Sequence, residues 1–220
     1  LAGPCKSLTG NQHATVFATD NGWGAVYPIE RKSQCAEALA LQHHRVGAAR
    51  ILCSDHASEF VGRDSDFRKM ARKAGTYCRS IEPHTQRHNI AEGYIRELKR
   101  EYKKFKQATN SPKAVWDELL RFIAMKKSHT VHKHISLESQ VPQTVIDGST
   151  ADISALVELE WYEWVWFKPD TGAPRNVKKS ENVSESTQDE YDSYDDRGLG
   201  RNLGPSIDVG ENMCVKVLTK

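Results

Sequence analysis

Hydrophobic and polar positions alternate in short blocks over residues 1–130, and the blocks switch between a strand period and a helix period. Strand side chains repeat every second residue and helix side chains about every 3.6, so each switch predicts a new element. Asn21-Gly22 separates two strand-like blocks and is typical of a tight β-hairpin turn. The pattern predicts, in order, strands at 15–19 and 23–29, a helix at 33–45, a strand at 49–53, a helix at 64–74, a strand at 76–81, and helices at 89–106 and 111–129.

This order of elements predicts an α/β fold in which helices cover both faces of a mixed sheet. Local signals support several of the ends: Ser33 and Ser111 are typical N-caps, Pro112 suits a first helical position, and Gly75 suits the end of a helix. The inner side of the first helix is predicted to consist of Ala36, Leu39, Ala40 and Leu41.

Beyond residue 130 the pattern changes. Residues 157–167 carry five aromatic side chains in a strand-like run, and 205–218 resemble a returning strand pair. Between them, residues 175–197 are polar and acidic, a composition that predicts a disordered loop. We therefore divide the chain into a core domain at 1–130, a connecting segment at 131–156 and a small, partial β module at 157–220.

Composition narrows the class of protein only slightly. The 31 basic and 29 acidic residues give a net charge of +2, so only local clustering of charge could argue for nucleic acid. The five cysteines form no C-x-x-C pair, which favours an intracellular, reducing compartment. No apolar run is long enough for a membrane span. Because the chain begins with Leu1 and not with Met, we expect its start to lie upstream.

Two carboxylates are candidates for chemistry. Asp55 follows the strand predicted at 49–53, at the kind of strand end where side chains converge on a ligand. Glu92 falls in the first turns of the long helix, which can fold back beside that strand end. Two carboxylates without a basic partner need a cation, and Mg²⁺ suits such oxygen ligands. The alternative is that Asp55 only caps a turn and that Glu92 is solvated.

The long helix adds a row of cations. At about 100° per residue, Glu92, Arg96, Lys99 and Lys103 project in nearly one direction. The apolar side is formed by Ile90, Tyr94, Leu98, Tyr102 and Phe105. Cations spaced one turn apart beside a metal site would lie along backbone phosphates. The alternative is a solvated face with a Glu92–Arg96 ion pair.

Two segments surround the candidate carboxylates. One is Ser54-Asp55-His56-Ala57-Ser58-Glu59-Phe60, and the other is Pro83-His84-Thr85-Gln86-Arg87-His88-Asn89-Ile90-Ala91-Glu92. They resemble the Ser-Asp-Asn-Gly-x-Glu-Phe and Pro-x-Thr-Pro-Gln-x-Asn-Gly-x-Ala-Glu segments of the integrase catalytic core of long-terminal-repeat retroelements, most closely the copia type. Weaker likenesses to this family begin at Leu1-Ala2-Gly3-Pro4 and at Val141-Pro142-Gln143-Thr144-Val145.

The resemblance implies an RNase H-like fold with a mixed five-stranded sheet. It also implies a catalytic triad of two Asp and one Glu that holds two Mg²⁺ (or Mn²⁺) ions, in which Asp55 matches the second Asp and Glu92 the Glu. Arg96 and Lys99 match positions that face DNA in the family. The sequence departs from the family at His56 and Ala57, which replace Asn-Gly. The first Asp is expected just before Leu1; within the chain only Asp20 could replace it.

The implied function is integrase activity: metal-dependent processing of DNA 3′ ends and strand transfer. The implied partners are the element's DNA ends, target DNA and further copies of the chain, with no membrane, and the implied place of action is the nucleus. Two alternatives stay open: a non-catalytic DNA-binding remnant of a retrotransposon polyprotein, and an RNase H-like nuclease of another kind. Trp161, Trp164 and Trp166 either fill a core or stack on nucleobases.

Overall fold

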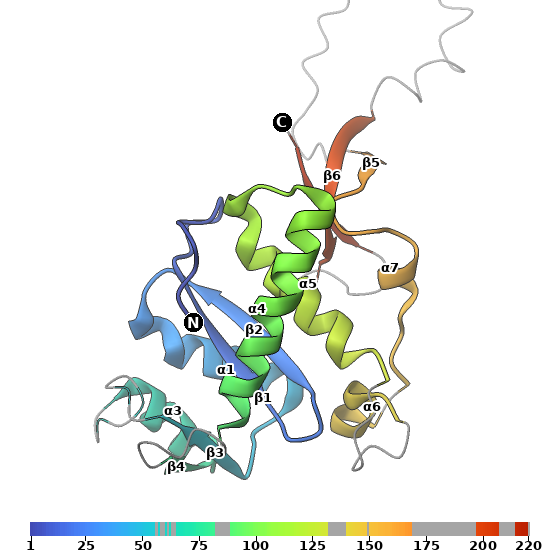
Figure 1. The fold of residues 1–220 in the computed structure, drawn as a ribbon. Coiled ribbons are helices and arrows are strands. Elements are labelled where there is room, and N and C mark those ends of the chain that lie inside the picture. The colour runs from blue at the N-terminus through green and yellow to red at the C-terminus, as the bar shows by residue number, and fades with distance from the viewer. Residues whose placement is uncertain are drawn as a thin grey trace, which may run out of the picture.

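The computed structural model describes residues 1–55, 57, 60, 62, 65–81, 89–131, 140–148, 150–168, 197–206 and 214–219. Strands and helices alternate along it, as Figure 1 shows. Its elements are β1 (His13–Ala18), β2 (Gly24–Ile29), η1 (Lys32–Gln34), α1 (Cys35–Val46), β3 (Ile51–Ser54), α3 (Asp66–Lys73), β4 (Tyr77–Ser80), α4 (Ile90–Thr109), η3 (Lys113–Val115), α5 (Trp116–Ser128), α6 (Pro142–Asp147), α7 (Ser154–Val157), β5 (Trp164–Phe167), β6 (Gly198–Pro205) and β7 (Val215–Leu218).

The strands form three small sheets. β1 and β2 make the predicted antiparallel hairpin, β3 and β4 pair in parallel, and β5, β6 and β7 form an antiparallel sheet. The predicted mixed α/β class is therefore confirmed. The described strands do not form one five-stranded sheet, because no strand among them hydrogen-bonds to both β1 and β3.

The hairpin separates two hydrophobic clusters, which follow from its period of two. Ala14 and Val26 face α4 and α5, whereas Phe17 and Tyr27 face α1 and α3. In Figure 1, α4 and α5 accordingly cover one face of the hairpin and α1 the other. The first cluster is centred on Tyr94, Leu98, Trp116, Leu119 and Ile123, and the second on Trp23, Leu39, Phe67 and Ala71.

Three predictions about helices were wrong. Ser33 caps no helix: it lies inside η1, and Gln34 is the N-cap of α1. Leu41 is 55% exposed, because it lies two positions, or about 200°, from the buried Leu39 on the same helix. Ser111 does not cap a helix: Pro112 keeps an extended backbone with ψ 148°, so a 3₁₀ turn follows and α5 begins at Trp116. Gly75 does end α3 as expected, with φ at +75°.

The aromatic run at 157–167 is only partly a strand. Trp161 is buried against Phe122, with ring centroids 5.3 Å apart, and Tyr162 turns the chain with φ at +65°. Consequently β5 begins at Trp164, and residues 154–157 form α7. The predicted pair at 205–218 is also shifted, since Pro205 ends β6. Apart from Arg197, the acidic segment at 175–197 lies outside the described residues, so its disorder stays a prediction.

The C-terminal sheet shares its core with the rest of the chain. Trp161 belongs to the cluster around α4 and α5, and Leu203 and Leu218 pack against that cluster. The boundaries proposed at 131 and 157 stay predictions. Among the described helices, none combines the length and the apolar composition that a membrane crossing requires.

A buried carboxylate fastens the N-terminal segment to α5. Asp117 accepts hydrogen bonds from Thr9 Oγ1 at 2.6 Å, Asn11 Nδ2 at 2.9 Å and the Glu118 amide at 3.0 Å. Burial raises the pKa of Asp117, but the hydrogen bonds from Asn11, Thr9, Ser7 and the Glu118 amide outweigh it, so the pKa lies below its ordinary value.

The Asp117→Asn variant should therefore lose about 2 kcal/mol of unfolding free energy at pH 7, the usual contribution of hydrogen bonds to a charged group. Because the folded-state pKa is depressed, this stabilisation is present above the unfolded value near 3.9 and disappears as the pH falls through the folded value. Urea unfolding at pH 7 and in acid measures it, with the exposed Asp66→Asn as control. A stability gap that persists in acid would contradict this account.

Candidate active site

Asp55 stands at the end of the parallel strand pair. The strand pairing extends to the residue before Asp55, because the Ile81 amide donates to Ser54 O at 2.9 Å. One carboxylate oxygen of Asp55 accepts from the Ala57 amide at 3.3 Å, so Asp55 does cap a turn, as the simpler alternative proposed. Its side chain is nevertheless exposed, and within the described residues its other oxygen makes no hydrogen bond.

Glu92 lies in the first turn of α4. Asn89 is the N-cap of this helix, and its side chain accepts from the Glu92 amide at 3.3 Å. A carboxylate in the first turn is stabilised by the helix dipole. The Glu92 side chain is exposed, and within the described residues neither Glu92 nor Asp55 takes part in a salt bridge.

Asp55 and Glu92 line the same cavity, of about 340 Å³. The cavity lies between β1, the end of β3 and the start of α4, so the topology brings together two carboxylates that are far apart in sequence. Leu1 and Ala2 line it as well. Asp20 does not: it lines a second cavity, of about 330 Å³, which adjoins the first and shares Val16, Phe17, Leu52 and Cys53 with it.

Two further residues line the cavity from elements that the sequence pattern does not connect with it. Lys32 from η1 and Cys35 from α1 line the cavity, and no local sequence signal points to either.

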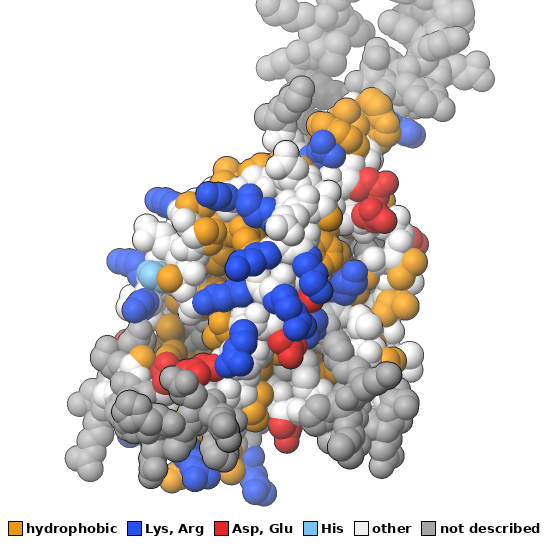
Figure 2. Space-filling model, viewed as in Figure 1, with side chains coloured by type: hydrophobic (Ala, Val, Ile, Leu, Met, Phe, Trp, Pro, Cys, Tyr) orange, Lys and Arg blue, Asp and Glu red, His pale blue; other side chains and the backbone are white. Residues whose placement is uncertain are grey.

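The row of cations on α4 is exposed as predicted. Tyr94 and Leu98 are buried on the opposite side of the helix, although Ile90 is 48% exposed. Arg96, Lys99 and Lys103 make no ion pair within the described residues, and the Glu92–Arg96 pair that the alternative required is not formed. Figure 2 shows basic side chains gathered over α4, a surface that can bind an anion.

The chemistry of the two carboxylates fits a divalent metal ion. They offer oxygen ligands on one cavity, and within the described residues no salt bridge occupies either of them; such donors suit Mg²⁺ or Mn²⁺. Two carboxylates are fewer than a complete two-ion site needs. In the part of the chain that the structure describes, no three metal-binding side chains lie close enough to share an ion.

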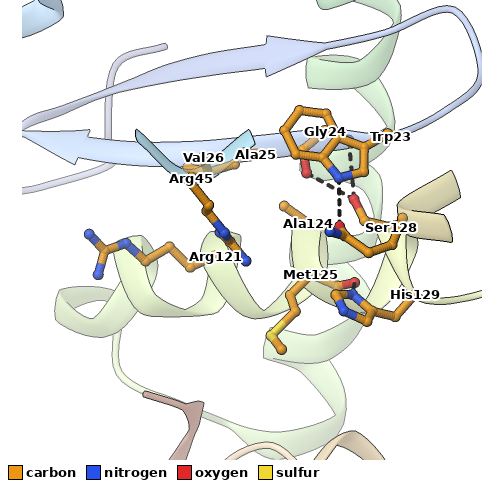
Figure 3. Close-up of a pocket in the computed structure, with 11 residues that line it drawn as sticks. Trp23, Gly24, Ala25, Val26, Arg45, Arg121, Ala124, Met125, Ser128 and His129 are labelled. Atoms are coloured by element: carbon orange, nitrogen blue, oxygen red, sulfur yellow. Dashed lines mark hydrogen bonds between the residues drawn. The ribbon is translucent and has the colours of Figure 1, made fainter. Parts of the chain in front are cut away.

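A third and much smaller pocket lies between β2, α5 and α6 (Figure 3). Its volume is about 20 Å³, which holds no more than a water molecule or so. Trp23 Nε1 donates to Gln143 at 2.7 Å, and the Ser128 hydroxyl bridges the amide and carbonyl of Gly24 at 3.1 and 3.0 Å. The Trp23–Gln143 bond attaches α6, in the segment that begins at Val141, to the core, and the two Ser128 bonds attach α5 to β2, so the pocket serves packing.

No protein-family model and no curated protein matches the chain. Among solved structures, it is similar to the HTLV-2 integrase catalytic core domain in complex with magnesium (trimeric form), at 14% identity and a TM-score of 0.48, over 60% of this chain and 83% of that one. The catalytic core domain of BIV integrase is similar at 16% identity and a TM-score of 0.45, over 62% of this chain and 89% of that one. A simian T-cell lymphotropic virus intasome in complex with PP2A regulatory subunit B56 gamma is similar at 11% identity and a TM-score of 0.43, over 94% of this chain and 76% of that one. Likenesses this distant do not assign the chain to a family, so its function has to be inferred from its own residues.

Proposed function

We propose that this chain is the catalytic core of a copia-type retroelement integrase, which trims DNA 3′ ends and joins them to target DNA. The observation that carries the proposal is the shared cavity: Asp55 and Glu92, singled out by their motifs, line it together. The cationic row of α4 begins one turn after Glu92, so DNA held along that row would enter the cavity.

The reaction is a phosphodiester exchange. The 3′-hydroxyl oxygen of one DNA end attacks a phosphorus of the target strand. A new P–O bond forms and the original 3′-O–P bond of the target strand breaks; the proton of the attacking hydroxyl passes to solvent, and the leaving 3′-oxygen takes a proton from solvent. Arg96 and Lys99 bind the phosphates that flank the scissile one and keep its phosphorus in line with the attacking oxygen. In the trimming step, water takes the place of the hydroxyl.

Asp55 and Glu92 would hold the metal ions of this site. When bound, such ions supply Lewis-acid stabilisation of the charge that builds on the phosphate during the displacement.

The five-stranded sheet and the first Asp belong to the same proposal. Leu1 already pairs antiparallel with β1, through its amino group to Ala14 O at 3.0 Å and through Ala14 N to Leu1 O at 2.8 Å. A strand that continued this pairing ahead of Leu1 would run along β1, antiparallel to it. Both large cavities lie there, lined by Val16 and Phe17 from β1 and by Leu52 and Cys53 from β3.

Such a strand would join the two small sheets into one of five strands. The residue just before Leu1 would then enter the cavity of Asp55 and Glu92, the position at which the resemblance implies the first Asp. Asp20 is the weaker candidate, because it lines the other cavity. Assembly into oligomers and action in the nucleus complete the proposal and follow from the resemblance alone.

The test is an end-joining assay with the protein expressed together with the residues encoded before Leu1. A labelled DNA end incubated with a plasmid and Mg²⁺ should become attached to the plasmid, and chelation of the metal should abolish the product. DNA binding measured in parallel separates the two leading interpretations. Tight binding without joining would support the non-catalytic remnant. That alternative is favoured by His56-Ala57 in place of Asn-Gly and by the two carboxylates, and no third, that line the cavity among the described residues. Cleavage without joining would support a nuclease.

A further inference from the structure

β5 and β6 carry a surface with the chemistry of a nucleobase-binding site, separate from the carboxylate cavity. Trp164 and Trp166 are 49% and 69% exposed and point from alternate positions of β5 to one side of the sheet. Alternate strand residues lie about 7 Å apart, so the two rings form separate stacking surfaces. Two tryptophans left open to water on one short strand need a binding partner to account for them, since lone exposed apolar residues are common but adjacent large ones are not.

A cation completes this surface. Arg201 lies directly opposite Trp164 in the strand register, with its guanidinium 3.7 Å from the centre of the Trp164 ring and 4.9 Å from that of Tyr162. Its Nη1 donates to Tyr162 O at 3.0 Å, and within the described residues no carboxylate pairs with it. The guanidinium is therefore held in place, with donors left over for an anion.

The geometry points to the stacking surface of Trp164, Trp166 and Arg201 as a binding site for single-stranded nucleic acid. Unpaired bases stack on exposed rings whatever their sequence, and a neighbouring guanidinium binds the backbone phosphate. Duplex DNA keeps its bases stacked inside and offers only phosphates to such a surface. The combination of open rings with a guanidinium that no described carboxylate pairs with thus favours a single strand over a duplex. It also favours a single strand over an apolar protein partner, which would offer no acceptor to the remaining donors of Arg201.

The position of the surface is consistent with this partner. In Figure 1, β5 and β6 lie at the opposite end of the molecule from β3 and β4, and α4 runs between the two ends. Figure 2 shows hydrophobic and basic side chains together at the β5 end and basic ones along α4. A strand bound at the stacking surface could continue along α4, but binding there does not depend on the proposed catalytic function.

The test measures binding of a fluorescein-labelled oligothymidylate strand to the full chain, without divalent metal, by fluorescence anisotropy. The Trp164→Ala/Trp166→Ala variant should bind about ten-fold or more weakly, with the salt dependence unchanged, because stacking releases no counterions. Arg201→Ala should lower the slope of log affinity against log salt by about 0.7. Trp166→Phe should retain most of the affinity. The control is Tyr77→Ala, which removes an exposed aromatic from β4 and should change nothing.

Duplex binding gives a second readout, since it should be nearly equal in wild type and in the double tryptophan variant. If the double variant unfolds, Trp166→Ala alone, at the more exposed ring, gives the answer. Unchanged oligothymidylate binding in these variants would overturn the inference. So would a loss of self-association in sedimentation velocity with unchanged oligothymidylate binding, because the surface would then be a protein interface. Failure of end joining would leave this result unaffected.

Discussion

Replacing Glu92 by glutamine is expected to stop DNA end joining in Mg²⁺ while DNA binding survives. The amide keeps the shape of the side chain but loses the charge that holds a divalent ion at the cavity. Such an ion supplies several kcal/mol of charge stabilisation during phosphoryl displacement, so the joining rate should fall by about a thousand-fold. The measurement is the rate of joining of a labelled DNA end under single-turnover conditions, with binding followed by filter retention.

Two further variants make this result specific. Asp55→Asn should have the same effect, because Asp55 lines the same cavity. Glu97→Gln is the matched control: it lies on the same helix and pairs with Lys127 at 2.6 Å, away from the cavity. It should keep joining activity near that of wild type. Full joining by the Glu92→Gln protein would remove Glu92 from the chemistry, and with it most of the case for an integrase.

The long helix shows why some features could be predicted from sequence. Its signals are local: Asn89 caps it, and the apolar spacing turns Tyr94 and Leu98 inward and Arg96 and Lys99 outward. The hairpin was predicted for the same reason, since the Asn21-Gly22 turn signal and the alternation of apolar residues both depend only on residues close in sequence. The placing of Asp55 and Glu92 at one cavity required one further inference, that the long helix returns beside the strand end.

Features that depend on packing between segments far apart in the chain could not be predicted from the sequence. Nothing near Lys32 shows that it lines the cavity of Asp55, because η1 reaches it only through the packing of α1 on the hairpin. The aromatic run is a second example: Trp161 and Trp164 look alike in sequence, yet one fills the core beside Phe122 and the other is exposed. What separates them is the turn at Tyr162, whose φ is set by the fold.

Reversing two charges on α4, as Arg96→Glu/Lys99→Glu, is expected to weaken duplex DNA binding by about a hundred-fold at 0.1 M salt. Each phosphate contact contributes about 0.9 to the slope of log affinity against log salt, so the slope should fall by about 1.8. Folding should barely change, because both side chains are exposed and neither is ion-paired within the described residues.

Binding isotherms across a salt series measure both quantities. Lys69→Glu/Lys73→Glu, with the same change of charge on the exposed face of α3, separates a local contact from a general effect of net charge. If DNA lies along α4, the α3 variant should keep a slope near that of wild type, whereas the α4 variant should lose about two contacts. Equal slopes in all three proteins would take DNA away from this helix, and equal losses in both variants would show that only overall charge matters. A selective loss would leave Glu92 at one end of a phosphate-binding row, which is the arrangement that strand transfer at this cavity requires.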